Sequence, residues 1–231
     1  MDLLRTELKT CIWIFEEFRK RYKMGHVIFA EGKNDVCFVR SLMEGREEID
    51  EVEEFLLSEY LKTHGGGLLI PEETKKIRKF IALKNPNDML VKSEGSKSSL
   101  LKTFSTLIVD MCQFNTRFSL IIDQDGSDVD HLINRINGHI GSQYLGSVVV
   151  SAESRVEITQ RISHTMCIVR GSNGLSDEFS LISFEPDLEE AACVNKANSR
   201  DTIEETISDY IDENPEFEEL AGELAATGAS D

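Results

Sequence analysis

Two carboxylates end an apolar segment in the middle of the chain, where Leu120-Ile121-Ile122 is followed by Asp123-Gln124-Asp125-Gly126. A short apolar run bounded by turn-forming residues is typical of a buried strand. Ligands of open α/β sheets bind beyond the carboxyl ends of the strands, and neighbouring carboxylates repel each other unless a cation neutralises them. The spacing therefore predicts an oxygen-rich site for Mg²⁺ or Mn²⁺. The alternative is a strand that ends in a turn, with Asp123 capping the next helix.

Two further acidic segments follow the same plan. The apolar segment 26–31 ends in Glu31, Gly32 turns the chain, and a predicted helix opens with Asp35 in its first turn. Later, Pro186 precedes Asp187-Leu188-Glu189 at the start of a helix predicted over 187–195. Asp35 is either a ligand or a partner of the helix dipole, and Glu189 is either a ligand or a solvated helical residue.

The elements that must position these groups alternate between strand and helix through the middle of the chain. This alternation predicts an α/β fold with a mainly parallel central sheet flanked by helices. Helices are expected over 2–23, 33–43, 44–60, 98–114, 127–140 and 187–195, and from 199 onward, and strands over 26–31, 68–70, 118–123, 144–151, 164–170 and 179–184.

The predicted domain organisation has three parts. An N-terminal helix spans 1–24, and an α/β domain spans 25–200 with a helical insertion at about 44–117. An acidic helical tail spans 201–231, and its last residues are expected to be disordered.

The net charge of -17 is concentrated near the C-terminus. From Asp201 onward the chain has eleven acidic residues and no Lys or Arg, which leaves 31 acidic against 25 basic residues, or -6, elsewhere. Such a body does not exclude a polyanionic ligand. A basic stretch over 72–104 is interpreted either as an exposed helix or as a face for a nucleic-acid backbone, to which the acidic tail could also bind. The candidate nucleic-acid-binding residues in it are Lys75, Lys76, Arg78 and Lys79.

No apolar run approaches the length of a membrane span, and the charged N-terminus does not resemble a signal peptide. The five cysteines are scattered without a CxxC pair, which favours buried thiols over disulfides or a zinc site. We therefore expect a cytoplasmic protein with no membrane partner.

The ordered pair of acidic motifs resembles the Toprim domain family. That family has an apolar strand followed by Glu-Gly with a nearby Asp, as in 27–38 here, and later a strand ending in Asp-x-Asp, as in 120–126. The resemblance covers about 25–195 and implies a Rossmann-like sheet that gathers Glu31, Asp123 and Asp125 at its carboxyl edge around one or two Mg²⁺ ions. Toprim domains occur in topoisomerases, primases, OLD-family nucleases, the small ribonuclease that matures 5S ribosomal RNA, and recombination mediators.

Within this family the chain is most similar to the OLD-like nucleases. Asp35 follows Glu31 by four residues, Asp187-Leu188-Glu189 resembles the third acidic motif of that branch, and Lys196 is the nearest basic residue beyond it, with Arg200 next. The resemblance implies a Mg²⁺-dependent nuclease acting on DNA or RNA. Its ligands would be Glu31, Asp123 and Asp125, with Asp35 and Glu189 for a second ion, Glu31 as a ligand or the general base, and Lys196 or Arg155 neutralising charge on the phosphate.

Two other classes remain open. One is a non-catalytic Toprim module that binds nucleic acid or a partner protein in DNA repair or phage defence. The other is a phosphoacceptor receiver domain, which the Glu31-Gly32 motif fits less well. OLD proteins carry an ATPase domain that this sequence lacks, so an ATPase partner in trans and a homodimer are further expectations.

Overall fold

The structure is a computed structural model that describes residues 25–46, 51–56, 80, 88–114, 116–144, 147–172, 174–195 and 197–225, the stretch 51–56 as backbone only. Several predictions lie outside these residues: the helix over 2–23, the strand over 68–70, the disordered end of the tail, Lys196, and the basic residues Lys75, Lys76, Arg78 and Lys79.

Within the described residues, seven strands form one mixed sheet in the order β2-β3-β1-β4-β7-β6-β5. Neighbours among β2, β3, β1, β4 and β7 pair in parallel, whereas β6 runs antiparallel to both β7 and β5. The predicted α/β class with a mainly parallel sheet is therefore confirmed. The strands are β1 (His26–Ala30), β2 (Glu51–Leu56), β3 (Asp88–Ser93), β4 (Arg117–Asp123), β5 (Val148–Thr159), β6 (Ile162–Gly171) and β7 (Ser176–Phe184).

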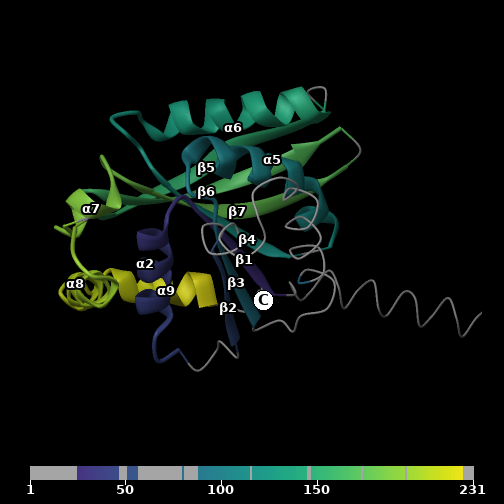
Figure 1. The fold of residues 1–231 in the computed structure, drawn as a ribbon. Coiled ribbons are helices and arrows are strands. Elements are labelled where there is room, and N and C mark those ends of the chain that lie inside the picture. Colours follow the sequence, from purple (N-terminus) through teal and green to yellow (C-terminus); the bar gives the residue numbers. More distant parts are fainter. Residues whose placement is uncertain are drawn as a thin grey trace, which may run out of the picture.

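Helices cover both faces of the sheet (Figure 1). Helices α5 and α6 lie on one face, and α2, α8 and α9 lie on the other. Because successive side chains of a strand point to opposite faces, Val27 and Phe29 of β1 join the first core, and Ile28 and Ala30 join the second. The helices are α2 (Lys33–Met43), α5 (Lys97–Gln113), α6 (Val129–Tyr144), α7 (Leu188–Ala191), α8 (Arg200–Asp212) and α9 (Phe217–Ala225).

Aromatic side chains fix the helices against the sheet. Phe38 of α2 packs edge-on against Phe184 of β7 and Phe217 of α9, with ring centroids 5.2 and 5.6 Å away. On the opposite face, Phe104 of α5 contacts Phe29 of β1 at 5.6 Å. These contacts hold α2 and α5 against the sheet, and the two helices start just after the parallel strands β1 and β3.

The segment predicted as a helix over 44–60 is different in the structure. Residues 51–56 form strand β2, which pairs in parallel with the unpredicted strand β3. The prediction of a helix over 44–60 is therefore wrong for residues 51–56, whereas α5, predicted over 98–114, is confirmed. The short segment 51–56 mixes charged and apolar residues in a pattern compatible with the period of a helix or of a strand. The neighbouring strand β3 supplies backbone hydrogen-bond partners, and these favour the strand.

The acidic segment from 201 is helical as predicted but is not a tail. Helices α8 and α9 bury Ile203, Ile207, Phe217, Leu220 and Leu224 against the sheet. The end of α9 is held by a hydrogen bond between the His26 ring and the Leu224 carbonyl (2.9 Å). The described part of 201–231 therefore belongs to the α/β domain, because its apolar stripe completes one core while its acidic face meets solvent.

Smaller differences concern element lengths near the C-terminal half. Strand β5 extends to Thr159 and forms a hairpin with β6, and α7 is a single turn where a helix over 187–195 was predicted. No helix in the described part of the chain is long and apolar enough to cross a membrane.

Candidate functional site

A cleft of about 300 Å³ lies at the carboxyl edge of the parallel sheet, beside the starts of α2 and α5. Four acidic side chains that the sequence singled out meet there from three distant segments. Glu31 and Asp35 flank the β1–α2 turn, Asp123 ends β4, and Glu189 lies on α7. The cleft is lined by Glu31, Gly32, Lys33, Asn34, Asp35, Gly95, Asp123 and Glu189.

Asp123 is the last residue of β4 and is partly buried. Its Oδ1 accepts a hydrogen bond from the backbone N–H of Leu188 at 3.1 Å, which ties it to the start of α7. Burial, together with the nearby charges of Glu31 and Glu189, raises the pKa of Asp123 from 3.8 to about 7, against the opposing effect of that hydrogen bond. Asp123 is therefore an acid held where its negative charge is poorly stabilised.

Asp35 is buried in the first turn of α2, and its Oδ2 accepts a hydrogen bond from the Gly32 backbone N–H at 2.8 Å. Burial raises the pKa of Asp35 well above its usual value, and the charges of Asp123 and Glu31 add to this. Both interpretations of Asp35 are thus compatible with its position, because it caps the start of α2 and also lines the cleft.

Glu31 follows β1 and has a buried oxygen, Oε2, with no hydrogen-bond partner among the described residues. Burial raises the pKa of Glu31, and the charges of Asp125 and Glu189 act in the same direction. The charge of Lys97 and a hydrogen bond from the Lys97 backbone N–H oppose this increase.

Asp125 lies beside the cleft rather than in its lining. Its side chain is mostly exposed and forms an ion pair with the buried ammonium group of Lys97. The backbone of Asp125 adopts a left-handed conformation (φ 52°), and its N–H donates to the Pro186 carbonyl at 3.0 Å. The turn after β4 thus directs the second carboxylate of the Asp-x-Asp motif towards α5.

Two residues of this site were not singled out from the sequence. Asn34 donates from Nδ2 to Glu189 Oε1 at 2.8 Å and so links α2 to α7. The sequence places Lys97 only within the basic stretch 72–104, because it does not indicate the strand β3 that brings α5 to this edge. The position of Lys97 directly after Gly95-Ser96, near the start of a helix, was the one feature of the sequence that could have indicated its place in the site.

Other candidate cations lie elsewhere. Arg155 lines a separate small hollow with Gln124 and Glu185, and Arg200 forms an ion pair with Glu204 at 2.8 Å. The structure therefore gives neither arginine a place in the acidic cleft.

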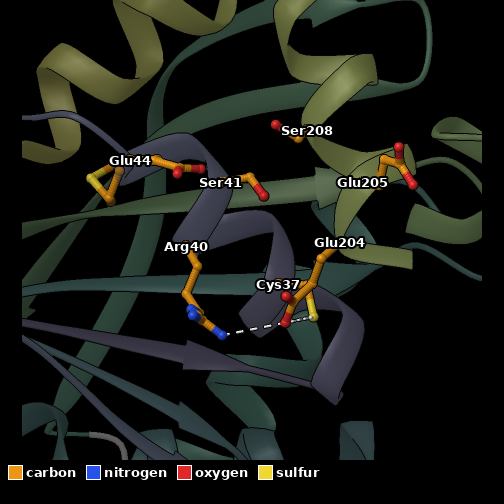
Figure 2. A pocket seen from close by; sticks show the side chains of 8 residues that line it. Cys37, Arg40, Ser41, Glu44, Glu204, Glu205 and Ser208 are labelled. Carbon is orange, nitrogen blue, oxygen red and sulfur yellow. Dashed lines mark hydrogen bonds and ion pairs between the residues drawn. The ribbon is translucent and has the colours of Figure 1, made fainter. Parts of the chain in front are cut away.

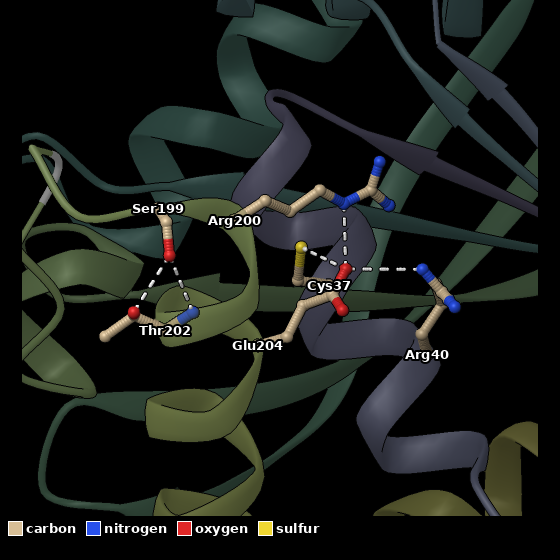
Figure 3. Close-up of polar contacts among 6 residues, drawn as sticks. All are labelled: Cys37, Arg40, Ser199, Arg200, Thr202 and Glu204. Carbon is tan, nitrogen blue, oxygen red and sulfur yellow. Dashed lines mark hydrogen bonds and ion pairs between the residues drawn. The ribbon is translucent and has the colours of Figure 1, made fainter.

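A second hollow of about 480 Å³ lies between α2 and α8 (Figure 2). Arg40, Arg200 and the Cys37 thiol all converge on the carboxylate of Glu204 (Figure 3). Burial and the charge of Glu204 raise the pKa of Cys37 to about 11, so the thiol is protonated and a poor nucleophile at neutral pH. We interpret this cluster as a polar link between two helices.

The donor set of the acidic cleft suits a hard divalent cation, which takes carboxylate oxygens as ligands. The unpartnered Oε2 of Glu31 and the raised pKa values of Glu31, Asp35 and Asp123 are what an uncompensated cation site would show. Among the described residues, no three His, Cys, Asp or Glu side chains form a ready metal-binding group. One predicted ligand, Asp125, is paired with an ammonium group instead.

The chain was also compared with known proteins. No protein-family model matches it, and no curated protein is significantly similar to it.

Proposed function

We propose that this protein is a Mg²⁺- or Mn²⁺-dependent Toprim nuclease, closest to the OLD-like branch, that hydrolyses phosphodiester bonds in DNA or RNA. One observation carries the proposal. Acidic side chains from β1–α2, β4 and α7 meet at the carboxyl edge of a parallel sheet, and burial and mutual repulsion raise the pKa values of three of them. Such an arrangement destabilises the folded chain unless it serves a ligand.

The residues have distinct roles in this proposal. Glu31 and Asp123 would hold the cation with Asp125, and Asp35 and Glu189 would serve a second ion. A bound divalent cation polarises a phosphoryl oxygen and lowers the pKa of a water molecule. Alternatively, Glu31 would accept the proton of the attacking water, because its Oε2 is unpartnered and its pKa is raised.

The partners follow from the same resemblance. DNA or RNA would bind along the basic segment that contains Lys75, Lys76, Arg78 and Lys79, and Lys196 would neutralise charge on the phosphate. An ATPase partner in trans, a homodimer and a cytoplasmic location belong to the same proposal.

A second candidate function is a non-catalytic Toprim module that binds nucleic acid or a partner protein. The ion pair between Lys97 and Asp125 favours it, because an internal cation then permanently neutralises one of the motif carboxylates. In that case the acidic cleft would be a remnant of a catalytic site or a structural feature.

Cleavage assays separate the two functions. Plasmid DNA, single-stranded DNA and RNA are incubated with Mg²⁺ or Mn²⁺ and the wild-type chain, the Asp123→Ala/Asp125→Ala variant, or Asp209→Ala, which removes an exposed carboxylate on α8. We expect the cleavage rate of the double variant to be at least about 100-fold lower than that of the wild type, and the rate of Asp209→Ala to be unchanged. Circular dichroism confirms that each variant is folded. Equal cleavage by the double variant contradicts the nuclease proposal, and binding without any turnover supports the second function.

A further inference from the structure

Lys97 is a basic side chain that interacts with both acidic motifs of the site. Only 8% of the residue is exposed, yet its ammonium group pairs with Asp125 after β4. Its charge and its backbone N–H also act on Glu31 after β1, and both lower the pKa of that carboxyl group. A single residue therefore contacts the two motifs that define the site.

The backbone around Lys97 fixes this position. Gly95 adopts a left-handed conformation (φ 74°), and its N–H donates to the Glu31 carbonyl at 2.7 Å. Ser96 then caps α5 by accepting from the Ser99 N–H at 3.3 Å. Lys97 occupies the first position of α5, and the buried residues Leu100 and Leu101 anchor that turn in the core. The ammonium group thus reaches the carboxylates from a rigid helix start.

We propose that Lys97 is the resident counter-ion of the acidic cleft, and that a divalent cation displaces it from Asp125 so that its ammonium group then contacts a substrate phosphate. This inference rests on the proposed function. In the cation-free protein, the ammonium group offsets repulsion between Glu31 and Asp125, which lie close enough for the charge of Asp125 to raise the pKa of Glu31. Without that counter-ion the repulsion between the two negative charges would be stronger.

The exchange follows from electrostatics. A divalent cation on Asp125 and an ammonium group on the same carboxylate repel each other, so the two occupants compete. A displaced lysine remains on the rim of the cleft as a mobile point charge, which is a form in which lysine binds phosphate. Lys97 would therefore weaken cation binding and strengthen the binding of a phosphodiester once the cation is present.

A purely structural ion pair predicts something else. If Lys97 only ties α5 to the turn after β4, its removal lowers stability, and a bound divalent cation leaves the ammonium group paired with Asp125. The two roles are distinguished by the affinity for the cation and by the affinity for nucleic acid, which the proposal predicts to change in opposite directions.

The test measures Mn²⁺ binding by isothermal titration calorimetry for the wild type, Lys97→Gln and Lys102→Gln. Lys102 is an exposed lysine on the same helix, so its substitution makes the same charge change away from the cleft. We expect Lys97→Gln to bind Mn²⁺ about tenfold more tightly than the wild type, as removal of a competing ion pair predicts, and Lys102→Gln to bind as the wild type does. In saturating Ca²⁺, single-stranded DNA should bind Lys97→Gln more weakly than Lys102→Gln.

The outcomes separate the two proposals. If the wild type binds Mn²⁺ and Lys97→Gln has the same affinity, the role of Lys97 is refuted while the proposed function stands. If none of the three chains binds Mn²⁺, both are refuted. Binding by Lys97→Gln alone supports the competition directly.

A second measurement uses the wild-type chain and does not depend on folding of the variant. Acylation of each lysine by an amine-reactive ester is followed by mass spectrometry with and without Mn²⁺. We expect Mn²⁺ to increase the labelling rate of Lys97 several-fold and to leave Lys102 unchanged. Unchanged or slower labelling of Lys97 at saturating Mn²⁺ overturns the inference.

Discussion

Replacement of Asp123 by Asn should stabilise the cation-free protein at alkaline pH. The Asn side chain has nearly the same shape as Asp and keeps an oxygen that accepts the hydrogen bond from the Leu188 N–H. It removes a negative charge beside Glu31 and Glu189. The direction is unusual, because most substitutions of partly buried polar residues destabilise a protein. It follows from the raised pKa of Asp123, which shows that folding disfavours its charged form.

The magnitude follows from the same pKa. A change from 3.8 to about 7 corresponds to roughly 4 kcal/mol, and solvent around this partly exposed side chain reduces the effect to about 2 kcal/mol. Below pH 4 the acid is protonated in both folded and unfolded chains, so the variant gains nothing. Between pH 4 and 7 only the unfolded chain releases the proton, so wild-type stability falls relative to the variant. Above pH 7 the difference is complete.

Urea denaturation in EDTA at pH 5 and pH 8 provides the assay, with thermal melting as a second measure. Asp123→Asn should exceed the wild type by about 2 kcal/mol at pH 8, or roughly 4–8 °C in melting temperature for a chain of this size, and by less at pH 5. Asp209→Asn is the control and should change stability little at either pH. A variant that is equally stable or less stable than the wild type at pH 8 would refute the proposed repulsion in the cleft.

Two further predictions concern packing and reactivity. Phe38→Ala should lower the free energy of unfolding by about 3–5 kcal/mol, because it removes the ring that packs between Phe184 and Phe217. The control Phe114→Ala, which removes an exposed ring, should change the free energy of unfolding by less than about 0.5 kcal/mol. Equal losses in the two variants would contradict the packing of Phe38 in the core. Iodoacetamide at pH 8 should modify the exposed Cys193 well before Cys37 or Cys167, whose pKa values burial raises to about 11 and about 12. Peptide mapping that found Cys167 labelled first would show that the first core, which contains this thiol, opens easily.

The acidic residues of the cleft could be predicted because each one lies at the end of an apolar segment or at the start of a predicted helix. Glu31 and Asp123 follow strands whose apolar runs are unmistakable, and parallel strands present their carboxyl ends at one edge of a sheet. The position of Glu189 could be expected from Pro186 and the predicted helix start. These signals are local, so they can be recognised in the sequence without knowledge of the tertiary structure.

The role of Lys97 and the position of strand β3 in the sheet could not be predicted in the same way. Strand β3 has the sequence Asp-Met-Leu-Val-Lys-Ser, and its charged positions Asp88 and Lys92 are nevertheless buried. Lys92 is accommodated by an ion pair with Glu94 at 2.7 Å. From sequence alone a lysine is expected at the surface, because its charge can be buried only where a partner from the tertiary structure offsets the cost of removing it from water. Without β3, nothing in the sequence places the start of α5 beside Glu31.

The acidic C-terminal segment shows a related effect. Its eleven carboxylates predict a solvated tail, yet Ile203, Ile207 and Phe217 complete the core on the α2 face. Burial of one apolar stripe outweighs the repulsion among charges that stay in water. The hydrophobic spacing was visible, but the surface that it covers is formed by strands far away in the chain.

A direct Mn²⁺ titration tests most simply whether the cleft of Glu31, Asp35, Asp123 and Glu189 binds a divalent cation. Free Mn²⁺ is followed by electron paramagnetic resonance as the wild type, Asp123→Asn and the control Asp209→Asn are added. We expect saturable binding by the wild type and Asp209→Asn, and an affinity at least about tenfold lower for Asp123→Asn. No saturable binding by the wild type, or equal binding by Asp123→Asn, would contradict it.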